Sequence, residues 1–323
     1  MLTNNLASRA DSMMRLPLGP STLPSGRTES ISVRTRSRRA MTIPRVRPES
    51  SHEVTAVIPA PGPVTTQLLP LLALVTGIRG YAIFDLDGTL HPGTAGLALL
   101  NELNERGTCG RASVIRLTSF IRSLPQGHLH TREAATTAYQ LWADAMTGVR
   151  APTVRHVAHQ VWERQRAELF PFARSVVDLL RQRGWTTVLL SGSPQEIVRV
   201  AAQDLGLDHA WGAEFAVDRD VYSGQVVTAP GVPGTKLALL RSKQPGFRPT
   251  DALAIGNSVT DLELLDVVGH PLAFEPDPAL REAAAVRGWP IVDRTSALTF
   301  FSSVFTGCSP FIRSSPRPRA GSG

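Results

Sequence analysis

Apolar and polar positions along the chain predict strands and helices in alternation. Residues 81–87 (YAIFDLD) are an apolar run that ends in two aspartates, which favours a buried strand. From residue 170 onward, short apolar runs bounded by Gly, Pro and Ser alternate with segments of helical periodicity. Within that part, residues 210–227 favour a pair of strands. This alternation predicts an α/β fold with a doubly wound, parallel, Rossmann-like sheet.

A block without any strand pattern interrupts the alternation after the first strand. Its segments have apolar residues at helical spacing, as Val114 and Leu117 are. The predicted helices are 96–106, 111–124, 131–147 and 152–168. We therefore expect a core formed by residues 79–92 and 169–305, with a second, helical domain inserted at 93–168.

The net charge of +7 lies mainly in the terminal segments. The first 50 residues hold nine arginines against three acids, and residues 305–323 hold three arginines and no acid. Residues 1–60 and 306–323 lack hydrophobic periodicity and are rich in Ser, Pro, Arg and Gly, so we expect disordered tails. No aromatic residue interleaves the first nine arginines. Solvated tails, or a true start at Met41, are therefore favoured over binding to nucleic acid or anionic lipid.

The sequence offers no segment suited to crossing a membrane. Residues 64–78 (VTTQLLPLLALVTGI) are apolar, but this stretch contains Pro70 and is shorter than the roughly 20 residues that a spanning helix needs. We expect a helix or lead-in that packs on the domain. Two cysteines, Cys109 and Cys308, do not make a disulfide framework. A reduced, cytoplasmic setting is expected.

Polar residues lie at the ends of three predicted strands. Asp85 and Asp87 end the first strand, Ser191 ends another, and Asn257 and Ser258 end a third. Ligands of open α/β sheets bind beyond the carboxyl ends of the strands, so these side chains should converge. Of two paired carboxylates, one can attack phosphorus and the other can transfer protons. A cation must then separate carboxylate from phosphate; the alternative is a simple turn after the strand.

The stretch SGSPQE at 191–196 combines a phosphate-binding pattern with a helix start. The Ser191 hydroxyl and the Gly192 N–H precede a helix N-terminus, where anions bind readily. Ser193 is expected to have a structural role, capping that helix with Glu196 three residues later. The alternative for the whole stretch is an ordinary helix start.

Two later stretches supply a cation and further oxygen ligands. Lys236 lies in the first turn of a predicted helix, where the helix dipole disfavours a cation. An exposed lysine is one interpretation, and an ammonium that neutralises a phosphoryl group is the other. In GNSVTD, Asn257 can offer an oxygen to Mg²⁺ while Asp261 orients the site. Ser258 and Asp261 also have the spacing of a capping box.

The motifs DLDGTL, SGS, Lys236 and GNSVTD, in this order, resemble the haloacid dehalogenase superfamily of phosphohydrolases. The runs SGSPQEIV and GNSVTDLELLDVVGHPLAFEP are similar to the phosphoserine-phosphatase-like branch, subfamily IB, which carries a helical C1 cap between the first two motifs. The resemblance covers about residues 80–305. It implies Asp85 as nucleophile and Asp87 as general acid/base; Ser191, Gly192 and Lys236 as phosphate-binding residues; Asp85, the Asp87 carbonyl and Asn257 as Mg²⁺ ligands; and Asp261 as support of the metal shell.

Two positions depart from the family pattern. Asn257 stands where the family has a metal-binding aspartate, which predicts weaker Mg²⁺ binding. Thr94 stands where phosphoserine phosphatases have a glutamate for the substrate ammonium, which disfavours phosphoserine as the substrate. We expect a Mg²⁺-dependent phosphatase that hydrolyses a small phosphorylated metabolite through an aspartyl-phosphate. The alternatives are a weak or inactive regulatory protein of the same fold, motivated by Asn257, and a nucleic-acid-binding role of the tails.

Overall fold

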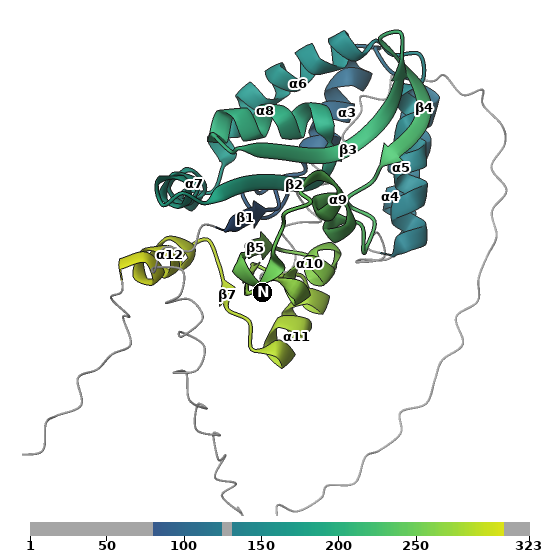
Figure 1. Cartoon of the computed structure of the whole chain (residues 1–323). Coiled ribbons are helices and arrows are strands. Elements are labelled where there is room, and N and C mark those ends of the chain that lie inside the picture. Colours follow the sequence, from purple (N-terminus) through teal and green to yellow (C-terminus); the bar gives the residue numbers. More distant parts are fainter. Residues whose placement is uncertain (1–79, 125–130, 307–323) are drawn as a thin grey trace, which may run out of the picture. The chain divides into compact units, whose positions relative to one another are not determined.

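A computed structural model describes residues 80–124 and 131–306 of the chain. Its strands are β1 (Tyr81–Phe84), β2 (Thr186–Pro194), β3 (His209–Asp218), β4 (Val221–Thr228), β5 (Leu253–Gly256), β6 (His270–Phe274) and β7 (Ile291–Val292). They form one sheet in the order β4-β3-β2-β1-β5-β6-β7 (Figure 1). Each neighbouring pair is parallel except β3 and β4, which are antiparallel. The predicted doubly wound α/β sheet and its strand pair are confirmed.

Alternate residues of β1 face opposite sides of the sheet, as the period of a strand requires. Ala82 and Phe84 belong to one hydrophobic cluster, whereas Ile83 belongs to the other. The first cluster includes buried residues of α7 (Phe172–Gln182) and α8 (Gln195–Leu205). The second includes residues of α9 (Lys236–Lys243), α10 (Leu262–Val267) and α11 (Pro278–Arg287). Helices on both faces therefore bury the central strand.

In the part of the chain that the structure describes, four α-helices lie between β1 and α7, and we call them the helical block. They are α3 (Ala95–Glu105), α4 (Arg111–Ser123), α5 (Arg132–Met146) and α6 (Ala151–Gln165). α3 and α6 pack on each other and on α8, while α5 packs on α4 and β4. Figure 1 shows α4 and α5 beside β4, at one end of the sheet. The block thus extends from the helices of the first cluster to the edge strand.

The structure adds elements that the sequence pattern did not predict. The short 3-10 helices are η3 (Arg166–Glu168), η4 (Pro249–Asp251) and η5 (Val259–Asp261). Helix α12 (Ala297–Thr306) includes the first residue of the predicted C-terminal tail. Its Phe301 ring stacks on Phe172 of α7 with centroids 6.5 Å apart. The rest of both predicted tails, the stretch 64–78 and Cys308 lie outside the described residues. In the part that the structure describes, no helix is long and apolar enough to cross a membrane.

Candidate functional site

The two aspartates of the first motif are held by a tight turn directly after β1. The backbone N–H of Asp85 donates to the Ile255 carbonyl at 3.0 Å, which continues the pairing with β5. Gly88 then turns the chain with a φ of 80°, a conformation that favours glycine. Its N–H donates to the His91 carbonyl at 2.7 Å. The turn fixes Asp85 and Asp87 at the carboxyl end of the central strand, as predicted.

Lys236 is a buried ion-pair partner of two aspartates and not an exposed lysine. Its Nζ lies 2.8 Å from Oδ1 of Asp85 and 2.5 Å from Oδ1 of Asp261. The exposed fractions of the three residues are 3%, 7% and 2%, respectively. Burial alone would lower the pKa of Lys236, but the carboxylates of Asp261 and Asp85 raise it above its ordinary value. The lysine therefore stays an ammonium beside Asp85.

Asp261 supports the loop after β5 from within. Its Oδ2 accepts hydrogen bonds from the backbone N–H groups of Asn257 at 3.0 Å and Ser258 at 3.1 Å. The predicted capping box with Ser258 is present. A Cβ on Gly256 would lie 2.4 Å from Cγ of Asp261, so only glycine leaves room for this carboxylate. Asp261 therefore connects the Asn257 loop to Lys236.

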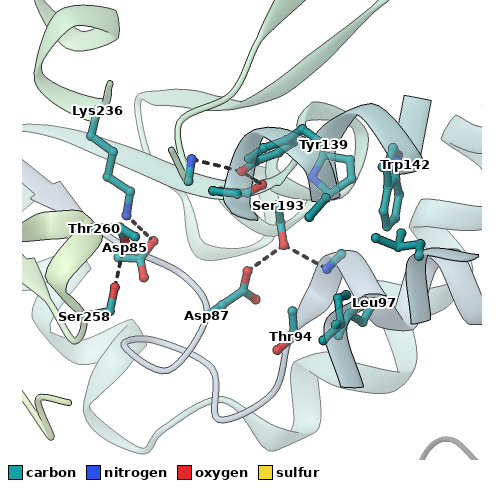
Figure 2. A pocket seen from close by; sticks show the side chains of 18 of the residues that line it. Asp85, Asp87, Thr94, Leu97, Tyr139, Trp142, Ser193, Lys236, Ser258 and Thr260 are labelled. Atoms are coloured by element: carbon teal, nitrogen blue, oxygen red, sulfur yellow. Dashed lines mark hydrogen bonds and ion pairs between the residues drawn. The ribbon is translucent and has the colours of Figure 1, made fainter. Parts of the chain in front are cut away.

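Asp87 is held by both the sheet and the helical block. Its Oδ1 accepts from the backbone N–H of Ala95, at the start of α3, at 2.8 Å. Its Oδ2 accepts from Oγ of Ser193 at 2.5 Å and from Oγ of Ser191 at 3.4 Å. Oγ of Ser193 also accepts from the N–H of Gly96 at 2.8 Å (Figure 2).

The predicted role of Ser193 as a helix cap is wrong. Strand β2 continues through Ser193 to Pro194, with a register shift after Leu190, and the residue before α8 makes no side-chain cap. Ser191 and Ser193 are two residues apart in this strand, and both hydroxyls reach Asp87. The two-residue period of a strand could have indicated that Ser191 and Ser193 point to the same side. The capping pattern at Ser193 favoured the other interpretation.

Negative charge exceeds positive charge at this end of the sheet. Among the described residues, the ammonium of Lys236 contacts the carboxyl groups of Asp85 and Asp261, and the carboxyl group of Asp87 is close enough to influence Asp85. Burial raises the pKa of Asp85 to about 7; Lys236 opposes this rise, while Asp261 and Asp87 add to it. Burial also raises the pKa of Asp87, against the hydrogen bonds from Ser193 and Ala95. Such a site favours an additional cation or a bound proton.

The oxygen donors present fit a Mg²⁺ ion. No group of three or more His, Cys, Asp or Glu side chains suited to a metal occurs among the described residues. A Mg²⁺ site here would therefore combine one or two of the described carboxylates with other oxygens, such as those of an amide, the backbone, water or a phosphate. The side chain of Asn257 packs directly on the turn that holds the two aspartates. A Cβ added to Gly88 would lie only 2.0 Å from Nδ2 of Asn257. Carboxylate and carbonyl oxygens of this kind are ligands that Mg²⁺ prefers.

A cavity of about 320 Å³ opens between the carboxyl ends of the central strands and the helical block. Asp85, Asp87 and Lys236 line one end, and Thr94, just before α3, and Trp142 of α5 are also among the lining residues (Figure 2). Gly192, Ser193 and Asn257 also line the cavity. The predicted residues Ser191 and Asp261 are buried and contact lining residues.

Tyr139 of α5 joins the helical block to the core, and sequence reasoning did not identify it. Its hydroxyl donates to the Gly192 carbonyl at 2.7 Å and accepts from the Gly231 N–H at 2.9 Å. Burial raises the pKa of Tyr139, so the hydroxyl keeps its proton. Its partners lie 53 and 92 residues away in the chain. No local pattern could have pointed to this contact.

Comparison with known proteins shows which protein family this chain resembles. The family model for haloacid dehalogenase-like hydrolases matches residues 82–266. A Mycobacterium tuberculosis protein named as a probable phosphatase is 28% identical over 218 residues, 66% of this chain and 75% of its own. Phosphoserine phosphatase SerB2 from the same species is 30% identical over 206 residues, 62% of this chain and 46% of its own.

Solved structures share the fold at low sequence identity. A crystal structure of a Bordetella pertussis protein of unknown function has a TM-score of 0.55 at 24% identity and covers 67% of this chain and 99% of its own. A substrate complex of phosphoserine phosphatase has a TM-score of 0.50 at 18% identity and covers 69% of this chain and 98% of its own. The range matched by the family model, residues 82–266, includes all four motifs of the site. This chain is a member of the haloacid dehalogenase-like hydrolase family.

Proposed function

We propose that this phosphatase of the haloacid dehalogenase family hydrolyses a small phosphomonoester with Mg²⁺, through an aspartyl-phosphate on Asp85. The observation that carries the proposal is the pairing of Asp85 with buried Lys236, beside Asp87, at the end of one cavity. A nucleophile, a proton donor and a fixed cation are the groups that phosphoryl transfer requires from a protein. The relatives named as phosphatases support the same reaction class.

In the first step, a carboxylate oxygen of Asp85 attacks phosphorus, and the bond from phosphorus to the ester oxygen breaks. Asp87 gives its proton to the departing oxygen, which leaves as an alcohol. The raised pKa of Asp87 favours the protonated form that this step needs. In the second step, Asp87 takes a proton from water as the water attacks the aspartyl-phosphate. Inorganic phosphate leaves and the Asp85 carboxylate is restored.

The remaining residues bind and neutralise the phosphoryl group. We assign its contacts to Lys236, the Gly192 N–H and the neighbouring Ser191. Asp85, the Asp87 carbonyl and Asn257 would hold Mg²⁺, with Asp261 behind them. When bound, the ion supplies positive charge that offsets repulsion between the carboxylates and the phosphate. The helical block acts as a cap that excludes water from the cavity.

The test compares phosphate release by the wild type, Asp85→Asn and the control Asp178→Asn, with Mg²⁺ and a panel of phosphomonoesters. Asp178 is exposed on α7, away from the cavity. We expect Asp85→Asn to lose at least about a thousandfold in kcat, because the nucleophile is removed. Asp178→Asn should retain wild-type rates. Unchanged release by Asp85→Asn would exclude the aspartyl-phosphate route.

A catalytically weak binding or regulatory protein is the second candidate, and Asn257 is the observation that favours it. It predicts negligible release by the wild type from every ester at high Mg²⁺, together with recovered release in Asn257→Asp. Release by the wild type that depends on Asp85 excludes this candidate.

A further inference from the structure

The charged side chains among the described lining residues all lie at the end of the cavity where the phosphoryl group is proposed to bind. Among the described lining residues, the charged ones are Asp85, Asp87 and Lys236. The proposed reaction uses all three. An ammonium or carboxylate on the rest of the substrate would therefore find no opposite charge among the described lining residues. Removing such a charged group from water without a partner is strongly unfavourable.

The opposite end of the cavity has an apolar, partly aromatic wall. It is formed by Leu97 of α3, Leu117 and Ile121 of α4, Ala138 and Trp142 of α5, and Phe215 of β3. The rings of Trp142 and Phe215 are stacked, with centroids 6.2 Å apart. Figure 2 shows Leu97 and Trp142 on the side of the cavity away from Lys236. Such a wall suits an apolar group of the substrate.

Among the described polar groups near this wall, the hydroxyl of Tyr139 is already engaged. Tyr139 lines the cavity, while its hydroxyl bonds to Gly192 in β2 and to Gly231 in the segment between β4 and α9. Thr94, just before α3, contributes a hydroxyl but no charge. A polyol or an amino acid would lose hydrogen bonds to water where it contacts the apolar wall, and such unreplaced bonds are costly.

The size of the cavity fits a phosphoryl group together with one ring or a short chain. An apolar cavity of roughly 150 Å³ accommodates benzene, and this cavity measures about 320 Å³. We infer that the substrate is a phosphomonoester of an apolar alcohol, aromatic or aliphatic, and not of an amino acid, amino alcohol or polyol. This inference rests on the proposed function and specifies its substrate class.

The first test measures kcat/KM for phosphate release, with Mg²⁺, from benzyl phosphate, hexyl phosphate, O-phosphoserine, glycerol 3-phosphate and methyl phosphate. None of these esters has an activated leaving group, so their ranking reflects recognition. We expect benzyl and hexyl phosphate to exceed O-phosphoserine by roughly 10- to 100-fold, the effect of burying one apolar group of this size. Equal or higher values for O-phosphoserine or glycerol 3-phosphate would overturn the inference.

A second test reads binding without turnover. Isothermal titration calorimetry with Mg²⁺ compares benzylphosphonate with 2-amino-3-phosphonopropionate, two analogues that cannot be hydrolysed. Tighter binding of benzylphosphonate, by about tenfold or more, is expected. Release without this preference overturns the substrate class alone. The preference without any release overturns the catalytic proposal alone, and the absence of both binding and release overturns both.

Matched variants then locate the preference in the apolar wall. Ile121 lines the cavity, whereas Ile115 of the same helix is 47% exposed and does not line it. We expect Ile121→Gln to lower the ratio of kcat/KM for benzyl phosphate over methyl phosphate by about tenfold. Ile115→Gln should leave this ratio unchanged. Leu97→Gln, at another partly buried wall position, serves if Ile121→Gln does not fold. An unchanged ratio in a folded wall variant would overturn the assignment.

Discussion

Asn257 determines how much negative charge the proposed Mg²⁺ site carries. Its side chain lies against Gly88, beside the aspartate turn, and it offers a neutral amide where a carboxylate would add a charge. Changing Asn257 to Asp should lower the half-saturating Mg²⁺ concentration by about tenfold or more, because the added charge attracts the divalent ion at short range. Calorimetric Mg²⁺ titration measures this directly, and the Mg²⁺ dependence of phosphate release provides a second readout.

Asn101→Asp is the control for this change, since it adds the same charge on α3 outside the cavity lining. We expect its half-saturation to match that of the wild type. Equal half-saturation in the wild type and in Asn257→Asp would contradict the assignment of Asn257 as a metal ligand.

At the level of elements, Ser193 joins the end of β2 to the start of α3 through Asp87 and Gly96. Replacing it with Ala leaves the Gly96 N–H without this acceptor and should lower the free energy of unfolding by roughly 1–3 kcal/mol. The lost bond to Asp87 favoured the carboxylate form, so the pKa of Asp87 should rise further. The ionisation that controls proton donation in the pH profile of kcat/KM should therefore move to higher pH.

Urea unfolding and a pH profile of phosphate release check the two expectations for Ser193→Ala. Ser175→Ala, at an exposed position on α7, is the control and should leave both unchanged. A wild-type pH profile in Ser193→Ala would mean that the serine supports the fold without tuning Asp87.

How far the sequence predicted each element depended on how local its determinants are. The apolar run before Asp85 predicted β1 and the placement of both aspartates. A strand that is buried on both faces has consecutive apolar residues, and this pattern is visible in the sequence itself. Ser193 was misassigned because the stretch SGSPQE is compatible both with a helix cap at Ser193 and with a strand that continues through Ser193. Helix α12 was missed because its position depends on Phe301 packing against Phe172, a contact distant in sequence. Local sequence patterns therefore located the proposed catalytic aspartates, but they did not identify the contacts between distant elements that hold the site and the fold together.

At the scale of the whole folded part, the cavity depends on how the helical block sits against the sheet edge. Three side chains of α5 bond to backbone groups of β2, of β4 and of the segment between β4 and α9. Arg132 donates to the Pro233 carbonyl at 2.7 Å, Gln140 donates to the Gly224 carbonyl at 3.1 Å, and Tyr139 bridges Gly192 and Gly231. The first two side chains are exposed, so their bonds contribute little, whereas the Tyr139 hydroxyl is shielded from water. Tyr139 is therefore the contact whose loss should loosen the block most.

Tyr139→Phe tests this dependence, because it keeps the ring in the cavity and removes only the bridging hydroxyl. The Gly192 carbonyl and the Gly231 N–H lose a partner, which should cost roughly 1–3 kcal/mol of unfolding free energy. Because the block then closes less completely over bound ester, KM should rise several-fold, and hydrogen exchange of the Gly231 amide should accelerate. Tyr81→Phe is the matched control: its hydroxyl donates to Gln244 at 3.0 Å, and Tyr81 does not line the cavity. If both variants lose similar stability and neither changes KM, the bond of Tyr139 serves the fold and not closure of the cavity.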